Sequence, residues 1–298
     1  MSGTGSLPST AEVALIGSSG FIGSHTKAAL AEQGVTVRTL SRREIGPAGR
    51  PVDIRDAREL RLALTGATAV VHSASYIGSD SSLCRSINID GTRNVVREWQ
   101  ENAHGPLVYV STAAVYGDHR FHDLVEGARE PAPRTVRSQS RREAELIVLD
   151  AGGTVVRPHL VLGHGDRWVA DGIRDLLTRF GSLGDAGSAR HTAIEVTLLG
   201  RVLAELAVSP RRWPAEVFHA GNAEPITVSA LIDLLGVPAP GPRSDAAIMT
   251  DIATHPAYRF LAADRHLNVD KLAQVYTGSL TSPFSLAPSS AAWYLSRS

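Results

Sequence analysis

The fold is decided by the stretch Gly17-Ser18-Ser19-Gly20-Phe21-Ile22-Gly23. Residues 13–16 before it form an apolar run that predicts a buried strand, and residues 21–33 have the spacing of a helix. In such a loop the first glycine permits a tight turn, the second lets the backbone approach a pyrophosphate, and the third lets the helix pack closely on the sheet. The helix N-terminus adds free N–H groups and a positive dipole end. We therefore predict a dinucleotide-binding loop, the alternative being an ordinary glycine-rich turn.

Apolar runs and helical patterns alternate after this loop. Further strands are predicted at residues 35–40, 69–72, 107–110 and 154–156, and helices at residues 60–64, 88–98 and 141–149. Such alternation is typical of a parallel sheet that is covered by helices on both faces. The sequence therefore predicts an α/β fold with a doubly wound parallel sheet of the Rossmann type, whose first strand leads into the dinucleotide loop.

The alternating pattern weakens after Gly163, which suggests that a second part of the chain begins there. Residues 1–10 are rich in Ser, Gly and Pro and are expected to form a disordered tail. We expect a dinucleotide-binding domain from residues 11–163, with residues 189–222 returning to it, and a smaller C-terminal substrate lobe from residues 164–188 and 223–298.

Composition narrows the classes of function. The 30 basic and 30 acidic residues give a formal net charge of zero, so no basic excess indicates a nucleic-acid or anionic membrane partner. The single cysteine, Cys84, cannot form an intrachain disulfide, and no apolar run approaches the roughly 18 residues that span a bilayer. No Cys/His cluster has metal-ligand spacing. We therefore expect a cytoplasmic protein that acts on a small molecule and holds no metal.

The end of the second predicted strand indicates which dinucleotide binds. An acidic residue there binds the ribose 2′-OH of NAD, but the stretch is Leu40-Ser41-Arg42-Arg43 and contains no acid. Two guanidinium groups and a hydroxyl suit a 2′-phosphate, because arginine pairs with phosphate through two parallel hydrogen bonds. We therefore predict NADP, with NAD possible. The alternative is a solvated loop with surface arginines.

Motifs after the glycine loop occur in an order that is characteristic of one family. They are Asp53-Ile54, His72-Ser73-Ala74-Ser75, residues 88–94 (NIDGTRN), residues 110–117 (VSTAAVYG), residues 156–163 and residues 217–227 (VFHAGNAEPIT). Over about residues 12–240 the chain resembles the extended, atypical short-chain dehydrogenase/reductases of the NAD-dependent epimerase/dehydratase family. It is similar to bacterial ketoreductases that act on nucleotide-linked 4-keto-6-deoxysugars, enzymes that often serve natural-product pathways.

The resemblance implies a catalytic hydroxyl, a set of cofactor contacts and a possible homodimer. Within residues 110–117 the catalytic Ser/Thr of the family falls on Thr112. The cofactor contacts, taken from the loop, the second strand and the resemblance together, are Gly17, Ser19, Gly20, Phe21, Ile22, Gly23, Ser41, Arg42, Arg43, Asp53, Ile54, Ser73, Ala74, Ser75, Asn88, Arg141 and Pro158.

The chain departs from the family at the start of the fifth helix. Members carry a Tyr there and, four residues later, a Lys; the Tyr transfers the proton, and the Lys lowers the Tyr pKa and holds the ribose. Arg137 stands at the Tyr position and Arg141 at the Lys position. No tyrosine lies between Tyr116 and Tyr258, so a small shift of the alignment does not restore the pair.

The sequence therefore leaves several candidates for the proton donor. Guanidinium does not deprotonate near neutrality, so Arg137 would act by charge alone, and Arg141 could hold the ribose. Tyr116, four residues after Thr112, is one candidate donor, although a tyrosine in such a loop often only packs. Histidines form a second group of candidates because imidazole titrates near neutrality. They are His119, His122, His159 and His164.

Three functions are compatible with these residues. The first is an NADP-dependent oxidoreductase that reduces a carbonyl on a small biosynthetic substrate, such as a nucleotide-linked 4-keto-6-deoxysugar or a natural-product ketone. The second is a non-redox enzyme on the same fold, which catalyses a cyclisation, dehydration or epimerisation. The third is a catalytically inactive nucleotide-sensing protein. We favour the reductase, and substrate-dependent oxidation of NADPH separates it from the other two.

Overall fold

The computed structural model describes residues 11–42, 49–237 and 255–297. The tail expected at residues 1–10 and the predicted contact Arg43 lie outside this range. The chain divides into two compact units, each built from three segments. The first unit comprises the chain up to Val115 together with Pro131–Arg157 and Thr197–Phe218, and the second comprises Tyr116–Glu130, Pro158–Val196 and the chain from His219 onward.

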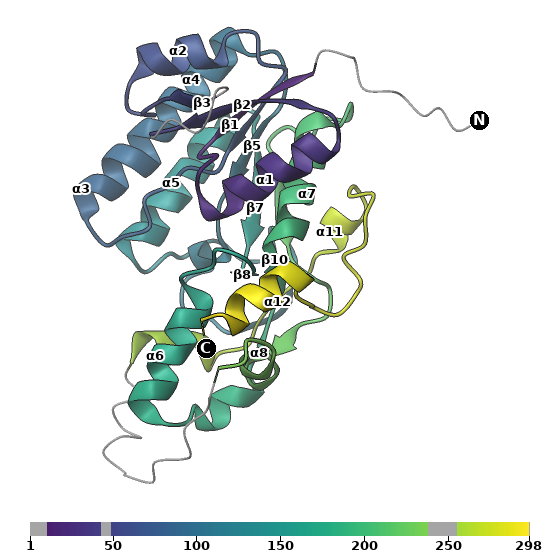
Figure 1. Cartoon of the computed structure of the whole chain (residues 1–298). Coiled ribbons are helices and arrows are strands. Elements are labelled where there is room, and N and C mark those ends of the chain that lie inside the picture. The colour runs from purple at the N-terminus through teal and green to yellow at the C-terminus, as the bar shows by residue number, and fades with distance from the viewer. Residues whose placement is uncertain (1–10, 43–48, 238–254, 298) are drawn as a thin grey trace. The chain divides into compact units, whose positions relative to one another are not determined.

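The first unit is built on a seven-stranded sheet (Figure 1). In spatial order its strands are β3 (Gly49–Pro51), β2 (Thr36–Ser41), β1 (Glu12–Ile16), β4 (Ala69–His72), β5 (Leu107–Val110), β7 (Thr154–Pro158) and β11 (Val217–Ala220). The neighbouring strands from β3 to β7 pair in parallel. The order reverses at β1, which is where ligands bind in open α/β sheets. The predicted doubly wound, Rossmann-type α/β fold is confirmed.

Helices cover both faces of this sheet, as Figure 1 shows. On one face lie α1 (Phe21–Glu32) and α7 (Val196–Val208), where a Cβ on Gly200 would stand 2.7 Å from the His25 carbonyl oxygen. The other face carries α2 (Ala57–Leu64), α4 (Thr92–Asn102) and α5 (Val136–Asp150). Alternate strand residues such as Ala14 and Ile16 pack with the apolar side chains of these three helices. The central strands β4 and β5 are wholly buried, which is why they appear in the sequence as continuous apolar runs.

Three predicted helices begin earlier than the apolar spacing indicated, among them the helix expected at 141–149, which starts at Val136. The helix expected at 60–64 starts at Ala57, because the Asp56 side chain accepts hydrogen bonds from the backbone N–H groups of Arg58 and Glu59. The helix expected at 88–98 starts as the short α3 (Ser81–Leu83). It continues through a π-helical segment, η1 (Cys84–Gly91), into α4. Such π-helical segments are frequent at functional sites.

The second unit contains two small sheets and several helices. One sheet pairs β8 (Leu160–Leu162) with β10 (Ala193–Glu195) in parallel, and the other has the order β12 (Ile226–Thr227), β9 (Arg190–His191), β13 (Arg265–Leu267) and β6 (Phe121–Leu124). The helices are α6 (Val169–Phe180), α8 (Val228–Leu234), α10 (Pro256–Leu261), α11 (Asp270–Ala273) and α12 (Pro288–Leu295), with the 3-10 turns η2 (Ala113–Tyr116), at the boundary with the first unit, and η3 (Gly184–Ser188). Strands of two to four residues are too short to show a period, so most of them were not predicted.

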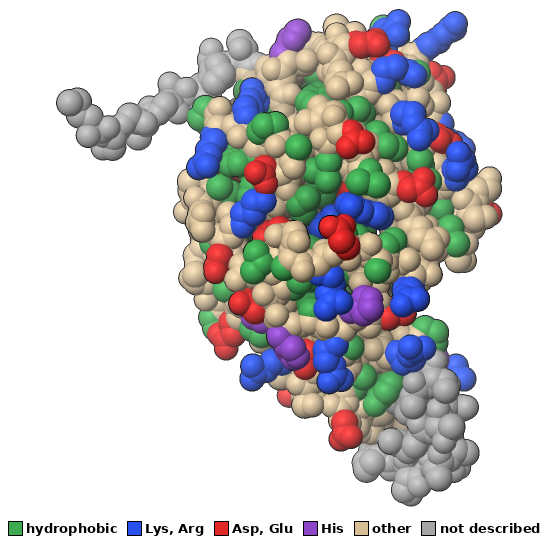
Figure 2. Space-filling model, turned by 180° about the vertical axis from the view of Figure 1, so that it is seen from behind, with side chains coloured by type: hydrophobic (Ala, Val, Ile, Leu, Met, Phe, Trp, Pro, Cys, Tyr) green, Lys and Arg blue, Asp and Glu red, His purple; other side chains and the backbone are tan. Residues whose placement is uncertain are grey.

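The surface carries both signs of charge. On the face shown in Figure 2, basic and acidic side chains are interspersed, in keeping with the formal net charge of zero. Among the described residues, no helix has the length and apolar content that a membrane span requires.

Candidate functional site

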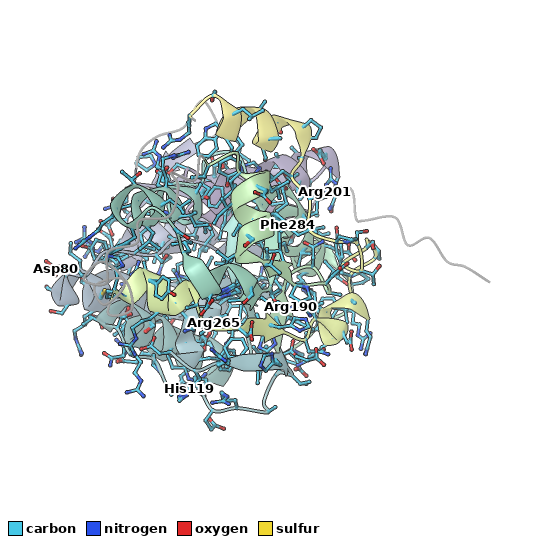
Figure 3. All side chains as sticks on the ribbon, turned by 90° about the horizontal axis from the view of Figure 1, so that it is seen from below. Asp80, His119, Arg190, Arg201, Arg265 and Phe284 are labelled. Atoms are coloured by element: carbon cyan, nitrogen blue, oxygen red, sulfur yellow. The ribbon has the colours of Figure 1, made fainter. Side chains whose placement is uncertain are left out.

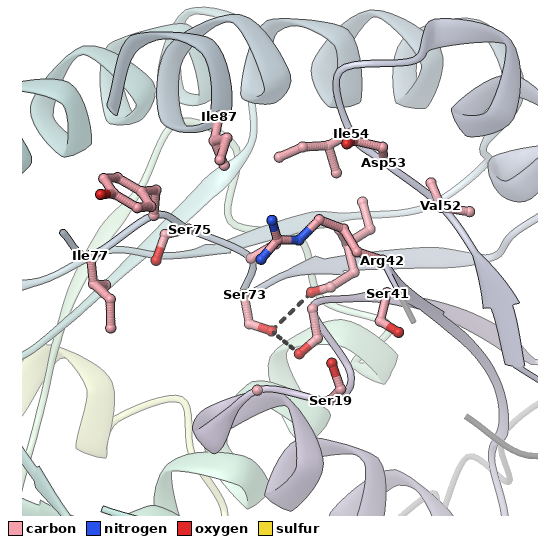
Figure 4. Close-up of a pocket in the computed structure, with 15 residues that line it drawn as sticks. Ser19, Ser41, Arg42, Val52, Asp53, Ile54, Ser73, Ser75, Ile77 and Ile87 are labelled. Carbon is pink, nitrogen blue, oxygen red and sulfur yellow. Dashed lines mark hydrogen bonds between the residues drawn. The ribbon is translucent and has the colours of Figure 1, made fainter. Parts of the chain in front are cut away.

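A cavity of about 650 Å³ opens in the first unit beside the glycine loop (Figure 4). Its walls come from the loop after β1, the end of β2, the segment 52–54, the segment that follows β4, and η1. The lining residues are Ile16, Gly17, Ser19, Gly20, Ser41, Arg42, Val52, Asp53, Ile54, Ser73, Ala74, Ser75, Tyr76, Ile77 and Ile87. The cavity thus lies at the switch point of the sheet, where the sequence predicts dinucleotide binding.

The glycines shape this cavity in different ways. Gly17 has φ +84°, and a Cβ there would stand 2.6 Å from the Ala74 backbone nitrogen, so only glycine fits the turn. A Cβ on Gly23 would overlap the Gly17 carbonyl oxygen, so this glycine serves the packing of α1 against the loop. Gly20 lines the cavity, and its Cβ would meet only the Gly17 oxygen, at 3.2 Å. The structure therefore needs Gly17 and Gly23 for the fold, whereas the absence of a side chain at Gly20 leaves room for a ligand.

Ser73 ties two walls of the cavity together. Its hydroxyl lies 2.9 Å from the Ile16 carbonyl oxygen and 3.5 Å from that of Gly17, as the dashed lines in Figure 4 show. Because Gly17 belongs to the loop and Ser73 follows β4, this contact holds the loop against the neighbouring strand. Because this contact fixes the conformation of the loop, less entropy is lost when a ligand binds.

One end of the cavity carries a guanidinium group and a carboxylate. Arg42 is exposed and its side chain extends over the cavity, above Ser73 (Figure 4). The carboxylate of Asp53 is hydrogen-bonded to the side chain of Arg55, with Nε 2.9 Å from Oδ1, and this hydrogen bond lowers the pKa of Asp53. The charge of Arg42 also lowers the pKa of Asp53, while its guanidinium extends over the cavity, where an anionic ligand would meet it.

Some of the residues predicted to contact the cofactor do not line the cavity. Phe21, Ile22 and Gly23 form the first turn of α1, and Pro158 ends β7 and belongs to the second unit. Asn88 lies behind the wall: its side chain bonds the backbone N–H and C=O of Tyr76 at 2.7 and 2.9 Å. Asn88 thereby holds a lining segment in place.

The two arginines of α5 have different surroundings. Arg141 is buried, donates to the Val110 carbonyl oxygen, and has its guanidinium carbon 5.1 Å from the centre of the Tyr109 ring. Arg137 is exposed, and its NH1 group donates to the Ile77 carbonyl oxygen at 2.8 Å. Arg141 therefore braces the end of β5, and Arg137 contacts the rim of the cavity.

A buried ion pair anchors α5 to the sheet. Glu145, fully buried, accepts hydrogen bonds from Nε and NH2 of Arg157 at 2.8 and 2.7 Å, and from Arg142 at 3.1 Å. The Arg157 side chain is 4 % exposed. Each charge of this pair is removed from water, so the loss of one partner is costly for the other.

The predicted catalytic hydroxyls occupy different environments. Thr112 follows β5 and is half-buried; its Oγ1 accepts a hydrogen bond from the Ala114 N–H at 3.1 Å, which leaves the hydroxyl proton to be donated. Tyr116 is fully buried in the second unit, where its hydroxyl lies 2.7 Å from Nε2 of His219. Because Nδ1 of His219 lies 3.2 Å from the Asn268 carbonyl oxygen, Nδ1 carries the ring proton and Tyr116 donates to Nε2.

The histidines considered as proton donors differ in how far they are buried. Nε2 of His159 lies 2.9 Å from Nδ1 of His191, and burial holds the pKa of His159 well below its ordinary value. His164 is exposed, His122 lies 3.8 Å from Asp264, and His119, labelled in Figure 3, is half-buried. His159 is therefore neutral near pH 7 and a poor proton donor.

Five lining residues were missed by the sequence analysis. They are Ile16, Val52, Tyr76, Ile77 and Ile87. Four are aliphatic and none belongs to a polar motif, so they look like ordinary core positions. Only Tyr76 and Ile77 could have been predicted, because they directly follow the predicted contacts at 73–75.

Fold and site together define a Rossmann-fold, dinucleotide-binding protein with a cavity at the switch point of its sheet. The sequence model of the family described as "NAD dependent epimerase/dehydratase family" matches residues 13–196, and the chain belongs to this family. The resemblance to this family seen in the sequence is thereby confirmed, as is the class of a NAD(P)-dependent oxidoreductase of the short-chain dehydrogenase/reductase type. The similarity to deoxysugar ketoreductases stays a prediction.

Individual relatives are more distant. A 2-alkyl-3-oxoalkanoate reductase of Stenotrophomonas maltophilia is 26 % identical over 80 % of this chain and 78 % of that protein. An N-acetyl-alpha-D-glucosaminyl-diphospho-ditrans,octacis-undecaprenol 4-epimerase of Escherichia coli O157:H7 is 28 % identical over 52 % of this chain, which spans half of that protein. A short-chain dehydrogenase/reductase superfamily protein of Agrobacterium tumefaciens, solved with bound NAD, has a TM-score of 0.73 and 17 % identity over 96 % of this chain and 95 % of its own. Likeness at this level shows the fold.

Proposed function

We propose that this protein is an NADP-dependent reductase of a carbonyl group on a small biosynthetic substrate, such as a nucleotide-linked 4-keto-6-deoxysugar or a natural-product ketone. The observation that carries the proposal is Arg42 extending over one end of the cavity while Arg55 engages the nearby acid, Asp53. Arginine suits the 2′-phosphate that distinguishes NADP from NAD. The name of the relative from S. maltophilia, a reductase of an oxo acid, supports carbonyl reduction.

The cavity fits a dinucleotide. Its glycine cradle would be filled by a Cβ at Gly17, and Gly20 leaves room at the N-terminus of α1, where N–H groups without intrahelical partners suit phosphate oxygens. Ser41 and Arg42 would hold the adenosine end, and Ser75 to Ile77 the opposite end. When bound, the reduced cofactor supplies the hydride for the carbonyl carbon.

The remaining steps fall to the chain's own residues. Thr112, whose hydroxyl proton is free to be donated, would hydrogen-bond the substrate carbonyl oxygen and stabilise the negative charge that develops there. The buried guanidinium of Arg141, held on Val110 two residues before Thr112, adds fixed positive charge near the end of β5. Tyr116 as the proton donor stays a prediction, and its hydroxyl lies 2.7 Å from Nε2 of His219.

Replacing Arg42 is expected to change cofactor preference. In Arg42→Ala, loss of the charge-assisted hydrogen bonds to the 2′-phosphate should weaken NADPH binding by roughly 10- to 100-fold and leave NADH binding nearly unchanged. Calorimetric titration of both cofactors measures this. Arg58→Ala serves as the control, because Arg58 is equally exposed and does not line the cavity. Equal losses for NADPH and NADH would count against an NADP preference.

Replacing Thr112 tests the catalytic hydroxyl. Thr112→Val keeps the shape and removes the donor, so we expect kcat for substrate-dependent NADPH oxidation to fall roughly 100-fold while the Kd for NADPH changes little. Thr112→Ser keeps the hydroxyl and should retain most of the activity. The assay uses a panel of keto-sugars and polyketide ketones. An unchanged kcat in Thr112→Val would remove Thr112 from the mechanism.

A second candidate function is a protein that binds the dinucleotide without reducing a substrate. It is favoured by Arg137 and Arg141, which stand where the family has its proton-transferring Tyr and its Lys. It requires dinucleotide binding but no NADPH oxidation by any ketone of the panel. The reductase requires dinucleotide binding and NADPH oxidation by at least one of these ketones. The cytoplasmic location, the homodimer and the substrate lobe at residues 164–188 and 223–298 remain predictions under either function.

A further inference from the structure

The cavity has two ends that differ in chemistry. The glycine loop lies along its middle, Ser41 and Arg42 lie toward one end, and Ser75 to Ile77 lie toward the other, as Figure 4 shows. Under the proposed function the 2′-phosphate lies at Arg42 and the pyrophosphate at the loop. The nicotinamide half then extends toward Ile77, and the substrate must approach it there.

The guanidinium group of Arg137 lies at this second end, and one of its nitrogen atoms is fixed by a hydrogen bond to the chain. Arg137 is the second residue of α5, whose start is fixed by reciprocal hydrogen bonds between Thr135 and Ser138. Its NH1 group donates to the Ile77 carbonyl oxygen at 2.8 Å. That carbonyl is itself well placed, because Asn88 holds both polar backbone groups of the preceding Tyr76.

The rest of this guanidinium is available. Among the described residues no carboxylate lies within ion-pair distance of Arg137, whereas Arg142, on the same helix, is paired with the buried Glu145. Arg137 is exposed, and the Ile77 carbonyl uses one of its five N–H donors. By contrast Arg141, one turn further on, is buried on Val110. Of the two arginines that replace the family pair, only Arg137 therefore presents donors to solvent.

An anchored guanidinium with free donors suits an anion. Its positive charge attracts an anion, and its planar fork matches two oxygens of a carboxylate or phosphate. Because NH1 is already fixed on the chain, less side-chain entropy is lost when the ligand binds. We propose that Arg137 recognises an anionic group of the substrate, a carboxylate or a phosphate, at the Ile77 end of the cavity. This inference rests on the proposed function and assigns the Tyr position of the family a role in substrate recognition.

The test compares probes that differ in charge. The protein is titrated calorimetrically, with and without NADP⁺, with 3-oxodecanoate, its methyl ester and UDP-glucose. We expect wild-type protein to bind at least one anionic probe about tenfold or more tightly than the ester, and Arg137→Gln to lose that preference. Arg137→Lys keeps the charge without the fork and should be intermediate. Arg134→Gln is the matched control, an exposed arginine just before α5 that should behave as wild type.

The outcomes distinguish a carboxylate from a phosphate as the anion, and failure of this proposal from failure of the proposed function. A loss confined to 3-oxodecanoate identifies a carboxylate, and a loss confined to UDP-glucose identifies a phosphate. Equal affinity of Arg137→Gln and wild-type protein for the anionic probes overturns the proposal, as does a wild-type protein that does not prefer an anionic probe. A variant that loses only NADP⁺ affinity would make Arg137 a positioning residue for the cavity wall. If wild-type protein binds no dinucleotide the proposed function fails, and the titrations without NADP⁺ still judge Arg137.

Discussion

Gly20→Val is expected to weaken NADPH binding by at least about 100-fold while the protein stays folded. The Val side chain would project from the N-cap of α1 into the cavity, where the pyrophosphate must approach the backbone. The fold should tolerate it, because Gly20 has φ −77° and its Cβ would meet one atom, the Gly17 oxygen, at 3.2 Å. Calorimetric titration gives the affinity, and thermal unfolding shows that the fold persists.

The matched control is another glycine with free space around it. Gly172 lies in α6 of the second unit and has no atom within 4 Å of its Cβ position, so Gly172→Val should bind NADPH as the wild type does. Gly17 and Gly23 are unsuitable, because a Cβ at either would collide with backbone and lower stability directly. Full NADPH affinity in a folded Gly20→Val protein would refute the assignment of the loop.

Glu145→Gln is expected to lower the free energy of unfolding by about 3–5 kcal/mol. The substitution removes the negative charge from a fully buried site and leaves the Arg157 guanidinium, 4 % exposed, without its carboxylate. The remaining cation is then shielded from water and has lost the carboxylate that offset its charge. In thermal unfolding the loss corresponds to a decrease in Tm of roughly 6–20 °C.

Glu143→Gln makes the same chemical change on the exposed side of α5 and should alter stability by less than about 0.5 kcal/mol. The comparison therefore isolates burial from loss of charge. A Glu145→Gln protein as stable as Glu143→Gln would mean that Arg157 finds another partner or water, and that the pair does not anchor the helix.

Much of the first unit was predictable because its signals are local. The glycine loop combines three residues whose spacing follows from turn, ligand and packing requirements, and the buried strands β4 and β5 appear as uninterrupted apolar runs. The second unit was hardly predictable, because strands such as β9 and β12 contain two residues each and are defined by partners far away in the sequence. Their pairing depends on tertiary contacts, which a periodicity cannot show.

The residues of the candidate site were predictable where the shape of the backbone puts them in the cavity wall. They were less predictable where the hydrogen-bond partners of a side chain determine which way it faces. Ser41, Arg42, Asp53 and Ser73 were predicted and line the cavity. Asn88 was expected to contact the cofactor, but its amide is taken by the Tyr76 backbone and Ser140. The sequence places such a side chain near the site, while the three-dimensional structure decides whether it faces the ligand or the protein.

The division of the chain into interleaved segments limits how the protein can be cut. The chain crosses from one unit to the other after Val115, Glu130, Arg157, Val196 and Phe218. A fragment that stops at Val115 would keep the glycine loop and lose β7, the partner of β5. The residues Leu107–Val110, wholly buried in the intact sheet, would then form a bare apolar edge that invites pairing with other chains. The nucleotide-binding half therefore cannot be obtained as a soluble piece by shortening the gene from its 3′ end.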